Sequence, residues 1–159
     1  MAAGESLRRL VGRALVAEHR DALRAAVGDL QFGAGVPGGA EALIHAVQAR
    51  TCSPQGRTMA WVQLDQANAF GQVSRAAVLA ALEEHAPELV PFASLFLRRR
   101  SSFIYVNEQG RGELLGAVEG VEQGDPLGPL LYCTAIRRSL EVLRAALVAE
   151  LERAGTPPA

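Results

Sequence analysis

Apolar residues recur at steps of three and four positions over five stretches of the chain, which is the spacing of amphipathic helices. These stretches predict helices over residues 7–27, 40–50, 74–85, 88–99 and 130–151. Each predicted helix has one apolar side that we expect to be buried. The positions expected to face the core are Leu43, Ile44 and Val47 in the second helix, and Leu130, Leu131, Thr134, Ala135, Leu140, Leu143, Leu147 and Leu151 in the last helix.

Two further regions have the apolar pattern of β-strands. Residues 59–64 are mostly apolar and predict a buried strand that ends at Asp65. Residues 102–106 and 113–119 flank a turn over residues 107–112, which predicts a β-hairpin. The order of helices, strand, helices, hairpin and helix is typical of an α+β fold.

The composition fits one domain over residues 1–159, with 49% apolar and 21% charged residues. No apolar run is long enough to span a membrane and the N-terminus lacks a secretory signal. We therefore expect an intracellular protein, in the nucleus or cytoplasm, without a membrane partner. The net charge of −1 and the lack of lysine exclude a global basic field and lysine-based chemistry. Cys52 and Cys133 are too few for a disulfide framework or a zinc site.

A glycine-rich segment, Gly33-x-Gly35-x-x-Gly38, matches the dinucleotide-binding fingerprint. That fingerprint requires a strand before it, a helix after it and an acidic residue about twenty positions further on. Here a helix is predicted before the segment, and Pro37 removes an amide that a phosphate would use. A dinucleotide-binding domain therefore stays an alternative with little support.

Two polar segments are stronger candidates for chemistry. Asp65 ends the predicted strand, and a carboxylate fixed at a sheet edge suits a metal ligand or a catalytic base. An aspartate that caps a turn or a helix is the alternative. Asp125 and Pro126 are typical of a helix start, with Asp125 as the N-cap. Capping does not explain Gln123 and Gly124, which would serve a site if they face a cleft.

Taken together, these segments resemble reverse transcriptases. Residues 62–75 resemble the first catalytic motif of that family, in which a strand ends in Asp and an aromatic residue follows five positions later. Residues 120–131, with Gln-Gly and Pro before a helix, resemble the next motif. Residues 7–10 and 35–41 resemble the fingers region of non-LTR retrotransposon and group II intron-like enzymes. The resemblance covers nearly the whole chain and implies a partial palm-and-fingers fold.

The resemblance also implies an activity, namely RNA-directed DNA polymerisation with two Mg²⁺ ions held by carboxylates. The implied partners are an RNA or DNA primer–template and a deoxynucleoside triphosphate. By resemblance, Asp65 is the catalytic carboxylate and metal ligand, and Phe70 is the steric gate against a ribose 2′-hydroxyl. The other substrate-binding residues that the resemblance implies are Gln66, Asn68, Ala69, Gln123 and Gly124.

The chain departs from the family pattern in its carboxylates. The family carries two adjacent aspartates in a later hairpin, whereas no Asp-Asp pair occurs here and Asp125 is the last aspartate. We therefore expect a truncated domain, without the Asp pair and the thumb, that is inactive as this chain. The alternative is a non-catalytic remnant that binds nucleic acid or protein, with Arg98, Arg99 and Arg100 as phosphate contacts.

The way this family arranges its two motifs around one nucleotide leads to three expectations about the geometry. Asp65 and Gln123 should face one cleft, although they are far apart in the sequence. The hairpin over residues 103–119 should lie beside that cleft. The ring of Phe70 should be partly buried beneath it.

Overall fold

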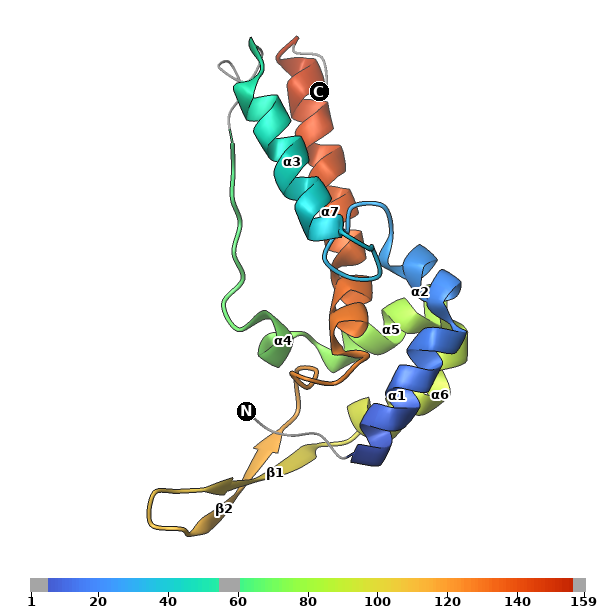
Figure 1. The fold of residues 1–159 in the computed structure, drawn as a ribbon, viewed down its shortest axis with the longest axis vertical. Helices are drawn as coiled ribbons and strands as arrows, with labels where there is room; N and C mark the ends of the chain where they lie inside the picture. The colour runs from blue at the N-terminus through green and yellow to red at the C-terminus, as the bar shows by residue number, and fades with distance from the viewer. Residues whose placement is uncertain (1–5, 55–60, 156–159) are drawn as a thin grey trace.

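The computed structural model describes residues 6–54 and 61–155 as a mixed assembly of helices and one two-stranded sheet (Figure 1). This is an α+β composition, as the sequence predicts. In chain order the elements are α1 (Ser6–Glu18), α2 (Arg20–Val27), α3 (Gly39–Cys52), α4 (Ala69–Gln72), α5 (Arg75–His85), the 3₁₀ helix η2 (Pro87–Leu89), α6 (Val90–Leu97), β1 (Ser101–Val106), β2 (Gly112–Ala117) and α7 (Gly128–Arg153).

The core lies around α5, which packs against α2, α6 and the first half of α7. Val78 and Leu82 of α5 are completely buried, as their helical spacing predicts. The helix begins where expected, because the Ser74 side chain accepts a hydrogen bond from the amide of Ala77 at 3.3 Å. It ends before Pro87, also as predicted. The other nearly inaccessible hydrophobic residues of this core are Leu23, Ala26, Val27, Ala86, Leu89, Leu127 and Leu131.

The predicted hairpin is confirmed. β1 and β2 pair antiparallel, with Phe103 opposite Leu115 and Val106 opposite Gly112. The Asn107 side chain accepts hydrogen bonds from two backbone amides of the turn, those of Gln109 at 3.1 Å and Arg111 at 2.9 Å. Hydrogen bonds among the turn's own residues thus close it, which is why a short stretch of sequence is enough to predict the turn.

Two predicted elements differ from the structure. The long first helix is divided at His19 into α1 and α2. The predicted strand over residues 59–64 is wrong where the structure describes it: residues 61–66 are not paired with any strand, and Val62 and Leu64 are 80% and 71% exposed. Met59 and Ala60 lie outside the described residues. In the described part of the chain β1 and β2 pair only with each other, so their sheet does not receive this segment.

A two-helix arm, made of α3 and residues 139–153 of α7, extends away from the core (Figure 1). The prediction of a buried apolar side is wrong for α3 and for this outer part of α7, whereas Leu130, Leu131 and Thr134 of the inner part are buried as predicted. α3 has only Gly39 buried, and the buried residues of α7 all precede Ala135. The arm residues predicted to be buried and found exposed are Leu43, Ile44, Val47, Leu143, Leu147 and Leu151. Leu140 is half-buried.

Membrane-spanning helices were also sought in the described part of the chain. None of its helices combines the length and the apolar character needed to cross a bilayer.

Candidate functional site

The two segments that resemble polymerase motifs are hydrogen-bonded to each other. The amide of Val121 donates to the carbonyl of Phe70 at 2.8 Å, and the amide of Gly120 donates to the carbonyl of Val73, also at 2.8 Å. Gly120 has a φ of +79°, and a Cβ on it would lie 2.5 Å from the carbonyl oxygen of Gly71. Only glycine fits this close approach of two backbones. The segment 120–124 therefore lies directly against the chain that follows Asn68.

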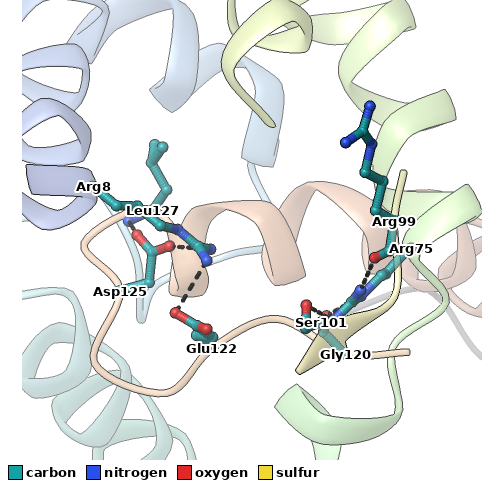
Figure 2. Close-up of polar contacts among 8 residues, drawn as sticks. All are labelled: Arg8, Arg75, Arg99, Ser101, Gly120, Glu122, Asp125 and Leu127. Atoms are coloured by element: carbon teal, nitrogen blue, oxygen red, sulfur yellow. Dashed lines mark hydrogen bonds and ion pairs between the residues drawn. The ribbon is translucent and has the colours of Figure 1, made fainter. Parts of the chain in front are cut away.

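Arg75, at the start of α5, holds this junction from one side (Figure 2). Its side chain is buried and donates hydrogen bonds to the carbonyl of Gly120 at 3.0 Å, the carbonyl of Arg99 at 2.7 Å and the hydroxyl of Ser101 at 2.9 Å. Burial lowers the pKa of Arg75, and the positive charge of Arg8 lowers it further. One guanidinium thus ties α5 to the base of the hairpin and to the Gln123 loop.

Arg8, on α1, holds the same loop from its other end (Figure 2). Its guanidinium lies 3.1 Å from the carboxylate of Glu122 and 2.6 Å from that of Asp125, and it stacks on the ring of Phe96 at 4.2 Å from the centroid. Asp125 is buried and also accepts a hydrogen bond from the amide of Leu127 at 2.9 Å. A charge pair this buried needs such additional hydrogen bonds to offset its desolvation.

The capping role predicted for Asp125 is correct in kind but not in position. Asp125 satisfies the amides of a turn, because its side chain binds Leu127 and its carbonyl accepts from Gly128 at 3.0 Å. The helix α7 begins only at Gly128, with Leu127 as its N-cap residue. Pro129, rather than Pro126, occupies the first helical turn, where its missing amide costs nothing.

A cleft of about 330 Å³ opens where these segments meet. Asn68 lines it from one segment and Gln123 from the other, and both are exposed to solvent. Phe103 and Ala117 of the hairpin form a further wall, so the hairpin lies beside the cleft as predicted. The structure does not bring Asp65 into this cleft. The expected pairing with Gln123 is found for Asn68 instead, which has a left-handed backbone with a φ of +49°.

A second hollow, of about 380 Å³, lies against α7 and is lined by other predicted site residues. Gln66 and Ala69 line it together with Tyr132 and Ile136 of α7. The hydroxyl of Tyr132 forms a hydrogen bond with the side-chain oxygen of Gln66. Burial raises the pKa of Tyr132, and the neighbouring Cys133 raises it further, so the hydroxyl keeps the proton that it donates.

The ring of Phe70 is partly buried as expected, but Phe70 is not among the residues that line the Asn68–Gln123 cleft. Its ring is half-buried and packs on the ring of Tyr132, with the centroids 5.1 Å apart and the planes at 34°. This contact lies on the α7 side of the segment, next to the second hollow. Gly124 lies in the loop beside Gln123 with a φ of +88°, and it is exposed. Asn68 and Gln123 thus line the first hollow and Gln66 and Ala69 line the second, whereas Phe70 and Gly124 line neither.

The three consecutive arginines end α6 and lead into β1, and all three side chains are exposed. Arg98 lies 3.7 Å from Glu83 in an exposed ion pair, which contributes little to stability. The carbonyl of Arg99 is the acceptor for Arg75 (Figure 2). Arg100 lies against Gly116 of β2. The run thus places three exposed positive charges at the base of the hairpin, with the backbone of Arg99 fixed by Arg75.

The remaining sequence candidates can be placed as well. The glycine-rich segment is preceded by α2 rather than by a strand, so it does not have the strand–loop–helix context that the dinucleotide-binding fingerprint requires. Within residues 6–54 and 61–155, no three His, Cys, Asp or Glu side chains are grouped to hold a metal ion. Cys52 is exposed, and Cys133 is buried against Gln31. Burial raises the pKa of Cys133 to about 11.

Sequence reasoning missed the two arginines that position the Gln123 loop. The sequence offers one signal for Arg75, because this residue directly follows a capping serine within the first motif-like segment. Arg8 had none, because its acidic partners are far away along the chain.

No protein-family model, curated protein or solved structure matches the chain. Its residues and their geometry are therefore the basis for any statement of function.

Proposed function

We propose that the chain is a palm-and-fingers segment of a retroelement reverse transcriptase, with the Asn68–Gln123 cleft as its nucleotide-binding site. The substrates would be a deoxynucleoside triphosphate and an RNA or DNA primer–template. One observation carries the proposal. The two motif-like segments, distant in sequence, are joined by the hydrogen bonds of Phe70 and Val73 with residues 120–121 and line one cleft.

The groups around the cleft are suited to a nucleotide more than to a simple anion. Asn68 and Gln123 supply amides that donate and accept hydrogen bonds, and Phe103 supplies an apolar wall. Glu119 and Glu122 give the cleft acidic groups, although Glu122 is paired with Arg8. The phosphate-binding charge would come from the exposed arginines that follow α6.

The residues present do not fit the two-metal site that the family implies. Two Mg²⁺ ions need several carboxylate oxygens that converge at short distance. Asp65 lies on an extended, exposed segment, and no metal-binding group of three acidic, His or Cys residues includes it in the described part of the chain. No Asp-Asp pair exists in the sequence to add to it. The proposal is therefore that these residues bind substrate, and that transfer requires carboxylates that this chain does not supply.

A second candidate is nucleic-acid binding without any polymerase role. It is favoured by the exposure of Arg98, Arg99 and Arg100 together at one end of the hairpin. Binding that rests on such contacts falls steeply with salt and is insensitive to base sequence. It would also be insensitive to changes at Gln123, which separates it from the first proposal.

Binding measurements on the full chain test both candidates. We expect Gln123→Ala to weaken deoxynucleotide binding about three- to tenfold, since each hydrogen bond contributes about 1 kcal/mol. The matched control is Gln48→Ala, an exposed glutamine on α3 outside the cleft, which should change nothing. Equal affinity in both variants would refute the assignment of the cleft.

Primer extension tests the catalytic half of the proposal. With Mg²⁺ or Mn²⁺ and an RNA template, we expect no extension by the chain alone. Extension that is lost in Asp65→Ala would show that a complete metal site forms around Asp65 and would overturn the proposal.

A further inference from the structure

A third hollow, of about 400 Å³, opens between α1, α2, the glycine-rich loop and the beginning of α7. It shares no lining residue with the Asn68–Gln123 cleft or with the hollow beside Tyr132. Its volume lies in the range of about 300–1,000 Å³ that is typical of small-molecule sites. Because two of its lining residues are Arg20 and Arg24, we call it the arginine hollow.

Arg20 and Arg24 bring two positive charges to the arginine hollow, and no acidic residue is among its lining residues. They are four residues apart on α2, so they lie on the same side of the helix and repel each other. Among residues 6–54 and 61–155, neither has an acidic side chain within ion-pair distance. Asp21, the acidic residue of α2, does not line the hollow. A negatively charged ligand between the two guanidiniums would replace this repulsion with two attractions.

The glycine-rich loop that joins α2 to α3 holds Arg24 at the hollow (Figure 1). The guanidinium of Arg24 donates a hydrogen bond to the carbonyl of Gly35 at 3.4 Å. Gly35 has a φ of +72°, and a Cβ on it would lie 3.9 Å from the side chain of Leu130 and 4.0 Å from that of Arg24. The loop thus lies directly against both side chains, and this one hydrogen bond leaves other N–H groups of Arg24 for a ligand.

Apolar side chains form the rest of the arginine hollow. Leu23 and Leu130 belong to the core and are 2% and 7% exposed. Val16, Val36 and Pro37 complete the apolar lining. Apart from the two arginines, no lining side chain can form a hydrogen bond. A ligand whose organic part carries hydroxyl or amide groups would therefore lose hydrogen bonds to water without replacing them.

The charge and the apolar lining together select a class of ligand. A phosphate monoester carries a charge of about −1.5 to −2 near pH 7, which matches two guanidiniums better than the single charge of a carboxylate does. Its oxygens also accept the paired hydrogen bonds that a guanidinium donates. The apolar lining favours a compact aromatic or aliphatic group over a sugar as the organic part.

We propose that the arginine hollow binds a small phosphate monoester whose organic group is compact and apolar. Arg20 and Arg24 hold the phosphate, and Leu23, Val36 and Leu130 contact the organic group. The site is independent of the proposed nucleotide cleft, since the two have no lining residue in common.

Equilibrium dialysis of the full chain, in a buffer free of phosphate, tests the site with phenyl phosphate as the probe. We expect phenyl phosphate to bind at one site per chain. Inorganic phosphate should bind at least about tenfold more weakly, because it lacks the ring that covers the apolar lining. Benzoate, which has the ring but only one charge, should also bind about tenfold more weakly. Glycerol 3-phosphate should bind no better than inorganic phosphate, because its organic part is polar.

Variants that remove one charge identify the phosphate contacts. Arg20→Gln and Arg24→Gln should each raise the dissociation constant of phenyl phosphate about tenfold, since each removes charged hydrogen bonds to the phosphate. The matched control is Arg144→Gln, which removes the same charge from an exposed arginine of α7 outside the hollow and should change the affinity less than about twofold. Circular dichroism should show the same helix content in all three variants, because each arginine is exposed.

A change in the apolar lining separates the organic part of the ligand from its phosphate. Val36→Ser should weaken the binding of phenyl phosphate about three- to tenfold and leave that of inorganic phosphate as it was. A variant that merely disturbed the fold around the hollow would weaken both.

Three results would overturn the proposal. The first is phenyl phosphate that does not bind at millimolar concentrations. The second is inorganic phosphate that binds as tightly as phenyl phosphate, since the apolar lining would then play no part. The third is an Arg144→Gln variant that loses as much affinity as Arg20→Gln or Arg24→Gln, since the effect would then come from net charge alone.

Discussion

Replacing Arg75 is the most direct test of how the cleft is held together. Arg75→Met keeps most of the apolar stem and removes every hydrogen-bond donor. Three acceptors then lose their partner: the carbonyls of Gly120 and Arg99 and the hydroxyl of Ser101, at 3.0, 2.7 and 2.9 Å from the guanidinium. These acceptors belong to two segments, residues 99–101 at the start of β1 and the loop that contains Gly120.

The size of the effect follows from the burial of each bond. A hydrogen bond from a charged donor contributes about 1.5–3 kcal/mol when it is buried. Only the bond to Gly120 is fully buried, whereas the acceptors on Arg99 and Ser101 are partly exposed and can recover a water molecule. We therefore expect Arg75→Met to lower the free energy of unfolding by about 2–4 kcal/mol, which is less than three full bonds.

Urea denaturation followed by circular dichroism measures this loss. Arg75→Lys should fall between the wild type and Arg75→Met, because an ammonium cannot reach three acceptors in a plane. The matched control is Arg138→Met on the exposed side of α7, which should change stability by less than about 0.5 kcal/mol. If Arg75→Met cost no more than Arg138→Met, the hydrogen bonds would not hold the segments together and the reasoning would be wrong.

Two further changes probe the same junction and the core. Gly120→Ala should destabilise by about 2–4 kcal/mol more than Gly110→Ala in the same denaturation assay, because both glycines have a positive φ but only Gly120 faces a backbone oxygen, that of Gly71. Near neutral pH a thiol reagent should modify Cys52 quickly and Cys133 only on unfolding, as mass spectrometry of timed samples would show, since burial raises the pKa of Cys133 to about 11. The pKa of Cys133 is higher in the folded chain than the ordinary thiol pKa of 9, so the free energy of unfolding should fall as the pH rises from 9 towards 11. Rapid modification of both cysteines near neutral pH would contradict the burial of Cys133.

Local signals in the sequence predicted the parts of the fold that need only neighbouring residues. The serine cap of α5 and the proline after it define a helix on their own, and Asn107 closes the hairpin turn with amides two and four residues away. The positions of these elements in the structure agree with the predicted ones within a few residues.

Periodicity failed where burial depends on a partner. Residues expected to face the core recur along α7 at steps of three and four positions before and after Arg137, yet Leu130 and Leu131 are buried and Leu147 is exposed. The pattern indicates that a helix has an apolar side, but it does not say which surface covers it. The same holds for Val62 and Leu64, whose apolar pattern predicts a buried strand that no neighbouring strand receives.

The candidate site shows which parts of a functional site the sequence can predict and which it cannot. The sequence predicted that two distant segments meet, and they do meet, through backbone hydrogen bonds that no side-chain pattern encodes. It did not predict which side chain faces the cleft, because the left-handed backbone of Asn68 turns the chain just before α4. A change of one residue's backbone conformation thus brings Asn68 to Gln123 and leaves Asp65 on an exposed strand-like segment.

The exposed arm and the unpaired segment have a common physical cause. α5 supplies the hub of the core, and it is long enough to cover α2, α6 and the first half of α7 but nothing beyond them. Elements that extend past the reach of α5, such as the outer half of α7 and residues 61–66, keep apolar side chains without a surface to bury them. An added surface would stabilise these elements by about 25 cal/mol for each square ångström of apolar area removed from water.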